Sequence, residues 1–356
     1  MSIITRESKK EDNLNFAIIG TGVAAEIHAK CIEEISETNL VAVSSLTQER
    51  AKRFAQLHDC DYYTDYNEML KRDDIDVVCI TTPSGTHAKI GIDVAKSGKH
   101  VIVEKPIDVS LKNAKDLIDA CREENVKLSV IFQHRFADDI VTLKNAIDNG
   151  EIGRINFGAS HTKVYRTQEY YDRAEWRGTW ELDGGGALIN QSIHYVDLLY
   201  YLVGSIDEVF AYMATRGHEI EVEDEAVASV KFENGAIGLI EANTNAYPGF
   251  YSRLDIYGDN GSVIIQDDRI VELALKSGKG EHWNESSTFD HASPTVPNDL
   301  HKRQFEDIVN AIKSGRESLV NGEEGLKSLE AVLAIYKSAK TGKSVRVKSL
   351  LSSSGV

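Results

Sequence analysis

The sequence predicts an α/β fold with two units: a doubly wound parallel sheet, followed by an α+β unit built on an open, mainly antiparallel sheet. Three observations support this prediction. Up to about residue 133, short apolar runs alternate with stretches of helical spacing, as in a parallel sheet with crossover helices. Beyond it, strand signals follow one another directly, with hairpin turns at Asn234-Gly235 and Asn260-Gly261. The length of 356 residues exceeds what one hydrophobic core usually serves.

The first unit is expected over residues 14–133, behind a disordered polar lead-in at 1–13. Apolar runs that end at Gly or Pro are typical of buried strands, and the stretches between them have helical spacing. We expect strands at 14–20, 40–45, 75–83, 100–106 and 127–132, with helices at 23–35, 48–58, 87–98 and 111–125.

The second unit is expected over residues 134–356. It starts with a helix, alternates between apolar and polar residues in its strands, and closes with two amphipathic helices. We expect strands at 153–166, 206–216, 225–245 and 252–266, with helices at 138–150, from about 187, at 299–315 and at 325–342.

Composition and charge exclude some kinds of partner. Hydrophobic residues make up 42% of the chain and charged residues 27%, as in ordinary soluble proteins. The formal net charge of −16 repels phosphate backbones and anionic lipid, so we expect no nucleic-acid and no membrane partner. No apolar run approaches the roughly 20 residues that span a bilayer, and no secretory h-region is present at the start. A small anionic substrate remains compatible, because a local basic pocket can override the global field.

The four cysteines all lie in the first half of the chain, without CxxC spacing and without a paired histidine nearby. This arrangement predicts no metal site and no disulfide framework, and it suits a reducing compartment. We therefore expect a cytoplasmic protein.

The stretch GTGVAA follows the first predicted strand and opens the first helix. Gly20 permits the tight turn, and Gly22 lets a pyrophosphate approach the backbone. The helix start, with Thr21, Val23 and Ala24, then faces the phosphates. A purely structural glycine turn is the alternative, but the strand before and the helix after the motif favour a dinucleotide-binding Rossmann domain.

The choice between NAD and NADP is left open by the sequence. The end of the second strand normally carries an acidic residue that binds the ribose 2′-hydroxyl of NAD. Here Ser45 stands at that place, and Arg50 follows one turn later. No carboxylate repels a 2′-phosphate and no arginine directly at the strand end clamps one, so both cofactors are compatible.

Two further strand ends carry polar residues, and ligands of doubly wound sheets bind at such ends. After one strand, Thr82, Pro83, Ser84 and His87 are expected to contact the ribose and phosphate of the cofactor. A capped helix start, with Ser84 as the cap, is an additional interpretation.

The next strand ends in Glu104, Lys105 and Pro106. Partial desolvation lowers the pKa of a lysine in such a crevice and suits it to proton transfer. An ordinary solvated lysine is the alternative.

The stretch DGGGALINQSIHYVDLLYYLVG places three glycines before a predicted helix. With α-helical spacing from about residue 187, Asn190 and His194 share a face, while Gln191 and Asp197 lie three residues to either side of His194. A lone histidine on a helix is usually structural. One aligned with amides opposite a cofactor site is a better candidate for chemistry.

Together, GTGVAA, the Glu104-Lys105-Pro106 triplet and the pattern GGG-x4-Gln191-x2-His194-x2-Asp197 resemble the Gfo/Idh/MocA oxidoreductases. The resemblance covers nearly the whole chain in the right order. It implies a Rossmann domain joined to a substrate-binding α/β domain, whose open sheet supports a homodimer or homotetramer. It also implies NAD(P)-dependent oxidation or reduction at a CH–OH carbon of a sugar, nucleotide sugar or polyol. The glycines would then let the backbone pass close to the sugar and the nicotinamide.

The resemblance also suggests roles for individual residues. Many family members have Asp where this chain has Asn190, which cannot take up a proton. Acid–base work is therefore expected from Lys105 and His194, with Asn190, Gln191 and Tyr165 contacting the substrate. The NQSIH and WRGTW stretches are similar to those of the UDP-N-acetylglucosaminuronate 3-dehydrogenases in this family.

In WRGTW, Trp176 is expected to cover the nicotinamide, and Arg177 to pair with a carboxylate or phosphate. A structural aromatic turn is the alternative. Arg135, between the two units, is expected at a hinge or interface.

The leading functional prediction is a dehydrogenase. NAD-dependent glycoside cleavage with transient hydride transfer is a second hypothesis, and a non-catalytic dinucleotide sensor is a third. The presence of Lys105 and His194 speaks against a sensor, which needs no proton transfer.

Overall fold

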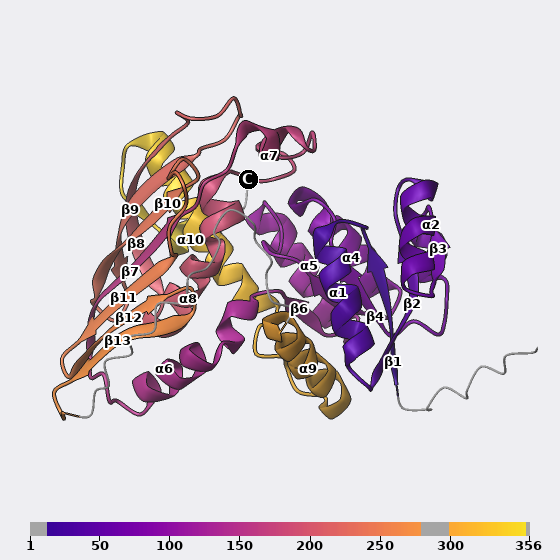
Figure 1. Cartoon of the computed structure of the whole chain (residues 1–356), viewed down its shortest axis with the longest axis horizontal. Coiled ribbons are helices and arrows are strands. Elements are labelled where there is room, and N and C mark those ends of the chain that lie inside the picture. The colour runs from indigo at the N-terminus through magenta and orange to yellow at the C-terminus, as the bar shows by residue number, and fades with distance from the viewer. Residues whose placement is uncertain (1–12, 279–298, 354–356) are drawn as a thin grey trace, which may run out of the picture.

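The computed structural model describes residues 13–278 and 299–353 (Figure 1). The lead-in expected at 1–13 lies outside the described residues except for Asn13. Two sheets with their helices stand side by side in the molecule. Among the described residues, no helix is both long enough and apolar enough to cross a membrane.

The first sheet contains six parallel strands. They are β1 (Leu14–Ile19), β2 (Thr38–Ser44), β3 (Asp61–Tyr63), β4 (Val77–Ile80), β5 (His100–Val103) and β6 (Leu128–Val130). Their order is β3-β2-β1-β4-β5-β6, and every residue of β4 is buried, as in a parallel sheet covered on both faces. The order reverses between β1 and β4, and such a switch point is where ligands bind. The Rossmann prediction is thereby confirmed, although the short strand β3 was not expected.

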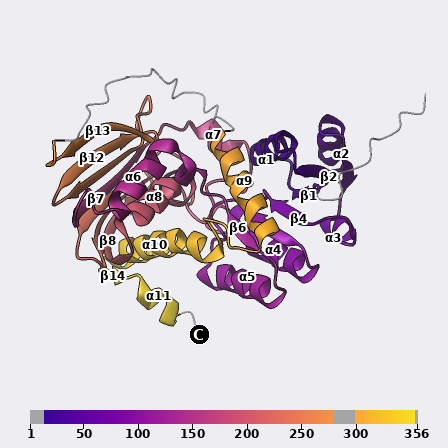
Figure 2. The same cartoon turned by 90° about the horizontal axis from the view of Figure 1, so that it is seen from below.

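Helices cover both faces of this sheet. They are α1 (Val23–Glu34), α2 (Gln48–Leu57), α3 (Tyr66–Leu70), α4 (His87–Lys96), α5 (Leu111–Glu123) and, from the far end of the chain, α9 (Asp299–Ser314). Figure 2 shows α1 and α9 on one face and α4 and α5 on the other. The ring of Phe305 in α9 lies 6.2 Å from the ring of Phe16 and 5.0 Å from that of His28. Sequence position assigned α9 to the second unit, but it packs on the first sheet.

The second sheet contains eight strands. They are β7 (Ile155–Lys163), β8 (Ile206–Ala214), β9 (Glu225–Phe232), β10 (Ile237–Asn243), β11 (Arg253–Gly258), β12 (Gly261–Gln266), β13 (Arg269–Leu275) and β14 (Val345–Arg346). Their order is β13-β12-β11-β7-β10-β9-β8-β14, and neighbours are antiparallel except for β7 and β10. The predicted hairpins connect β9 to β10 and β11 to β12.

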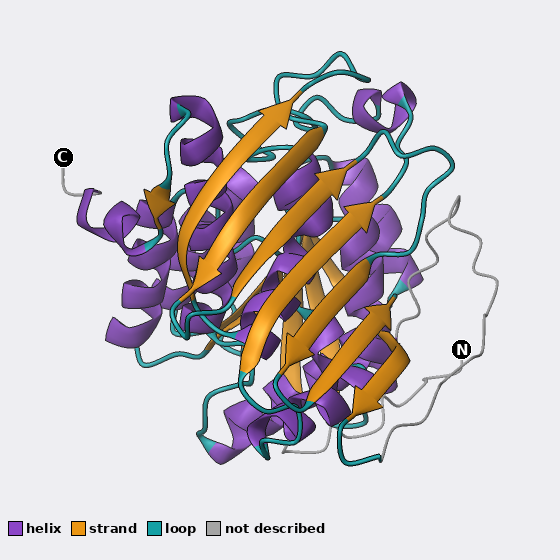
Figure 3. Ribbon diagram, turned by 90° about the vertical axis from the view of Figure 1, so that its left-hand side faces the viewer, coloured by secondary structure: helices purple, strands orange, loops and turns teal. Residues whose placement is uncertain are grey.

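One face of the second sheet is covered and the other is open, as Figure 3 shows. The covering helices are α6 (Asp138–Asp148), α8 (Ile193–Val203) and α10 (Gly322–Thr341). Buried and partly or fully exposed residues alternate along β9, which is the pattern of a strand with one solvated face. The remaining short elements are η1 (Ser84–Thr86), η2 (Gln133–Phe136), α7 (Gln168–Asp172), η3 (Ala187–Ser192) and α11 (Lys348–Ser353).

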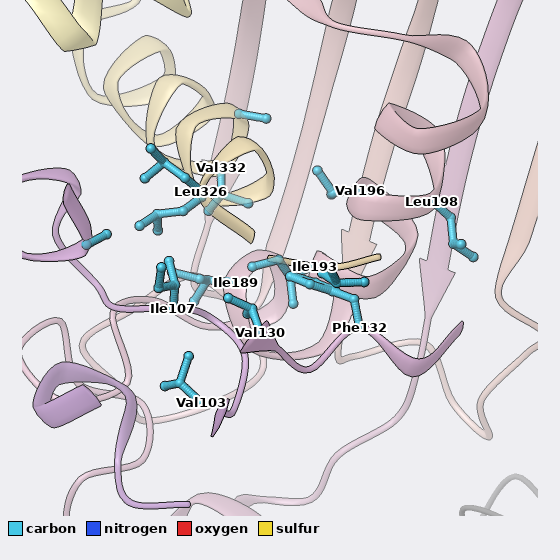
Figure 4. Packing of buried hydrophobic residues seen from close by; sticks show 14 of the residues in the cluster. Val103, Ile107, Val130, Phe132, Ile189, Ile193, Val196, Leu198, Leu326 and Val332 are labelled. Atoms are coloured by element: carbon cyan, nitrogen blue, oxygen red, sulfur yellow. The ribbon is translucent and has the colours of Figure 1, made fainter. Parts of the chain in front are cut away.

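A continuous apolar core joins the two sheets. In Figure 4, Val103 and Val130 of the first sheet lie near Ile189 of η3, Ile193 of α8 and Leu326 of α10. All five side chains are buried.

Arg135 in η2 holds this junction together. Its guanidinium, 1% exposed, donates from Nε and Nη2 to the two carboxylate oxygens of Asp197 in α8, both at 2.7 Å. Its Nη1 donates to Glu324 of α10 at 2.9 Å, and Ser328 of α10 donates to Asp197 at 2.9 Å. The expected interface role of Arg135 thus corresponds to a buried fork that connects η2, α8 and α10.

Replacing Arg135 by Met should lower the free energy of unfolding by about 3–5 kcal/mol, because Asp197 would remain buried without its partner. Arg122→Met is the matched control: Arg122 also pairs with two carboxylates, but its side chain is 64% exposed. That substitution should cost at most about 1 kcal/mol. Denaturant titration measures both, and equal small losses would contradict the assignment.

Candidate active site

The glycine turn between β1 and α1 has the geometry that a dinucleotide requires. Gly20 has φ +109°, and a Cβ there would lie 2.6 Å from Oγ1 of Thr81, so the fold itself demands glycine. Gly22 caps the start of α1, and a Cβ there would meet nothing within 4 Å. The backbone N–H groups of the helix start are thus open to an approaching phosphate.

The cofactor-specificity position lies next to this turn. The hydroxyls of Thr21 and Ser45 are 3.0 Å apart in a hydrogen bond at the end of β2. Arg50 is exposed in the first turn of α2, while Val23 is 81% exposed and Ala24 partly buried in α1.

The segment after β4 is tied together internally. Oγ1 atoms of Thr82 and Thr86 are 2.8 Å apart, and the ring nitrogens of His87 lie 2.8 Å from the carbonyl oxygens of Pro106 and Thr82. Burial lowers the pKa of His87. The ring of His87 thus holds the segment in shape, with both nitrogens engaged.

The alternative interpretation of Ser84 as a helix cap is wrong. Ser84 is buried and begins η1 after Pro83, whereas Thr86 occupies the cap position of α4 without a side-chain cap bond. Within η1, the N–H of Gly85 donates to the carbonyl of Leu182 at 2.9 Å. This bond brings the end of β4 against the segment that leads to the three glycines.

Lys105, after β5, reaches the same place. Its Nζ donates to the backbone carbonyl of Asn190 at 2.8 Å. Burial lowers the pKa of Lys105, against the opposing effect of Glu104 and Asp183. Burial alone would raise the pKa of Glu104, but the hydrogen bond and charge of His28, 3.0 Å away, hold it at about 2. Glu104 is therefore an ionised partner of His28.

The three glycines serve the packing of the protein, which corrects our expectation that they make room for a ligand. A Cβ at Gly184, with φ +83°, would lie 2.5 Å from Cγ1 of Val109. At Gly185, with φ +152°, it would lie 2.0 Å from the hydroxyl of Tyr336, and at Gly186 1.8 Å from the carbonyl of Glu223. Protein atoms thus surround all three.

The helix start also differs from the prediction. Residues 187–192 form the π-helical turn η3, and α8 begins only at Ile193. The buried carboxylate of Glu223 accepts hydrogen bonds from the N–H groups of Gly186 and Leu188 and from Tyr336, at 2.8–3.0 Å. Burial raises the pKa of Glu223 to about 7. Single π turns recur at functional sites, and this one carries Asn190 and Gln191.

Side-chain hydrogen bonds extend outward from this turn. Asn190 Nδ2 donates to Asp183 at 2.5 Å, and Gln191 Nε2 donates to Asn190 Oδ1 at 2.8 Å. Arg166 then donates to Gln191 Oε1 at 2.7 Å. Gln191 also donates to the hydroxyl of Tyr170 at 3.0 Å.

Two guanidinium groups meet at Tyr170. Arg177 donates to its hydroxyl at 2.7 Å, and Arg166 and Arg177 lie over its ring at 5.2 and 4.6 Å. Arg177 also lies 4.5 Å from the centre of the Trp176 ring. Among the described residues neither arginine forms an ion pair, and Nε of Arg166 is buried without a hydrogen-bond partner.

Two cavities open beside these arginines. One of about 670 Å³ is lined by Arg177, and one of about 400 Å³ by Arg166 and Tyr165. Tyr165 is 38% exposed and packs edge-on against Tyr247. The expected pocket residue Tyr165 thus lies in a cavity next to the polar chain.

His194, in the first turn of α8, lies among other rings. Its ring is 4.6 Å from that of His134 and 5.8 Å from that of Phe132. His134 in turn is 2.5 Å from the carboxylate of Asp268, which comes from the turn between β12 and β13. Burial, together with the charges of His134 and Lys105, lowers the pKa of His194 far below its usual value. His194 is therefore neutral at physiological pH.

Sequence reasoning missed four residues of this site: Asp183, Arg166, Tyr170 and His134. Asp183 precedes the glycines directly, and an acidic residue at a glycine turn is a signal that could have been used. The other three come together only through the fold. Within the described residues, no group of three or more His, Cys, Asp or Glu side chains could hold a metal ion.

Fold and site together define a dinucleotide-dependent oxidoreductase. Family models described as "Oxidoreductase family, NAD-binding Rossmann fold" and "Oxidoreductase family, C-terminal alpha/beta domain" match residues 14–132 and 144–347. The chain belongs to this Gfo/Idh/MocA family and is an NAD(P)-dependent oxidoreductase.

Several characterised proteins are similar over nearly their whole length. Myo-inositol 2-dehydrogenase of Thermotoga maritima is 26% identical, over 95% of this chain and 100% of that protein. The WlbA dehydrogenase of Bordetella pertussis, solved with NADH and UDP-GlcNAcA, is 32% identical with a TM-score of 0.83, over 94% and 98% of the two chains. A levoglucosan dehydrogenase solved with NADH is 25% identical with a TM-score of 0.85, over 94% and 99%.

Gly22→Val should abolish or severely weaken dinucleotide binding while leaving the fold intact, because the new side chain would enter open space on the path of the pyrophosphate. Gly20→Ala is the contrasting variant: its Cβ would collide with Thr81 and lower the melting temperature. Calorimetric titration with NAD(H) and NADP(H), together with thermal unfolding, separates the two effects. Wild-type affinity in Gly22→Val would rule out this binding mode.

Proposed function

We propose that the protein moves a hydride between a CH–OH carbon of a sugar or nucleotide sugar and a nicotinamide dinucleotide. The observation that carries this proposal is the meeting of Lys105 from the first sheet with Asn190 and His194 from η3 and α8. The Gly20–Gly22 turn lies at the switch point of the same sheet. Inositol, levoglucosan and nucleotide-sugar dehydrogenases among the relatives support this substrate class.

The residues of the chain divide the work as follows. The nicotinamide, when bound, accepts or supplies the hydride. Neutral His194 is suited to accept the proton of the substrate hydroxyl, and Lys105 to donate a hydrogen bond to the same oxygen. Asn190 and Gln191 orient the substrate through their amides, and Trp176 shields the reaction from water.

Lys105→Met and His194→Ala should each lower kcat by at least about 10²-fold while cofactor affinity stays within a few-fold, since a positioned acid–base group contributes that much. Asn190→Ala should act mainly on KM, because an amide cannot transfer a proton. Lys112→Met, an exposed lysine of α5, is the control and should leave kcat unchanged. Normal turnover by Lys105→Met would refute the proposed chemistry.

We further propose that the substrate is an acidic nucleotide sugar. Two guanidinium groups without a carboxylate partner among the described residues stand beside the site, in a chain with net charge −16. Keeping Arg166 and Arg177 unpaired in such a chain makes a local anion site, and arginine binds carboxylates and phosphates in bidentate fashion. The UDP-GlcNAcA bound to the WlbA dehydrogenase carries both groups.

Arg166→Met and Arg177→Met should each raise KM for a UDP-linked uronic acid by about 10-fold or more, the worth of one charge-assisted hydrogen bond. KM for a neutral free sugar should change little. Arg173→Met is the control, because Arg173 is exposed in the same segment. Equal effects on acidic and neutral substrates would contradict an anion site.

The open face of the second sheet supports a proposal about assembly. It carries exposed apolar side chains, among them Tyr212, Val227 and Ile237, each more than 45% exposed. An apolar face of this kind is typical of an interface between copies, and we propose a homodimer or homotetramer. A cytoplasmic location accords with four free cysteine thiols.

A further inference from the structure

Asp183 is a buried carboxylate that the mechanism above does not use. It is 2% exposed and stands directly before the three glycines. Its Oδ2 accepts from the N–H of Gly178 at 2.9 Å, and its Oδ1 accepts from Asn190 at 2.5 Å. Asp183 forms no ion pair with any described residue, although burying a carboxylate unpaired is costly.

The chemistry of the groups sets the direction of every bond in this polar chain. A carboxylate only accepts and a guanidinium only donates, so Asp183 must receive the Nδ2 of Asn190, and Arg166 must donate to the Oε1 of Gln191. The amide of Gln191 then has only its nitrogen left for Oδ1 of Asn190. The orientation of the Asn190 amide is thus decided by an anion at one end and a cation at the other.

Lys105 lies within the field of the same carboxylate. The charged and titratable groups that face Lys105 are Glu104, Asp183, Arg166, Arg177 and His194. Glu104 is already paired with His28, and the arginines oppose a positive charge on the lysine. Asp183 is the remaining carboxylate, and it is connected to Lys105 through Asn190, whose carbonyl oxygen binds Nζ.

We propose that Asp183 is a positioning residue that supplies the negative charge missing at position 190, orients the Asn190 amide and keeps Lys105 protonated. Its contribution to turnover rests on the proposed function, but its effect on Lys105 does not. Burial raises the pKa of Asp183, while Gly178, Asn190, Arg177 and Lys105 act in the opposite direction.

The first test measures Lys105 itself in the ligand-free protein. The rate of acetylation of Lys105 by acetic anhydride, followed by mass spectrometry of its peptide against pH, gives the midpoint of its deprotonation. Removing a nearby anion favours the neutral amine, so Asp183→Asn should lower the midpoint by about one pH unit or more. The exchanged variant Asp183→Asn/Asn190→Asp, which returns a carboxylate to the pair, should bring the midpoint back to within about 0.3 unit of wild type.

Controls separate this role from a structural one. Asp255→Asn removes another buried carboxylate, bonded to Arg253 on the second sheet, and should not move the midpoint. In Asp183→Asn the new amide oxygen can still accept from the N–H of Gly178, so the turn should survive; Asp183→Ser replaces this variant if it does not fold. An unchanged midpoint in a folded, uncharged variant, or no recovery in a folded exchanged variant, would overturn the proposal.

Activity gives the second readout. Asp183→Asn should lower kcat about 10-fold at neutral pH and shift the basic limb of the pH profile downward, with recovery in the exchanged variant. If the midpoint shifts as expected but Lys105→Met keeps full activity, the proposed chemistry fails and the positioning role stands. If Lys105→Met is inactive and the midpoint does not move, the reverse holds.

Discussion

The buried fork between Arg135 and Asp197 is the interaction on which the arrangement of the site depends. It fixes η2, the crossing between the two sheets, against α8, and Asp197 lies only three residues beyond His194. Because α10 joins the same fork through Glu324, the fork sets the position of His194 relative to both sheets. A water-exposed pair could not do this, since only a buried, bidentate pair has one favourable geometry.

The electrostatics of the site follow from where each charge is placed. Lys105 is partly desolvated and His194 is surrounded by rings and positive charge, so the ionised form of each is disfavoured. Glu104 and Asp268 are both engaged by histidines, which leaves Asp183 as the anion nearest the reacting groups. Positive charge is concentrated at Arg166 and Arg177, in spite of the acidic surface around them.

Features encoded in neighbouring residues were predictable, and features that link distant segments were not. The turn at Gly20 and Gly22 and the hairpins of the second sheet depend on local backbone geometry, which residue type reveals. The π turn at 187–192 depends on Glu223, more than thirty residues later, whose carboxylate binds its first N–H groups. No periodicity within the turn itself encodes that partner, so regular α spacing was the reasonable but wrong expectation. Arg166 likewise gains its meaning only when β7 brings it beside Gln191.

The return of α9 to the first sheet has a consequence for how the chain is made. Phe16 and His28 belong to its beginning, yet Phe305, which covers them, comes nearly three hundred residues later. A ribosome therefore releases the nucleotide-binding half long before that half can complete its own core. During synthesis this apolar face has no native cover, and a fragment that ended before α9 would keep it exposed for good.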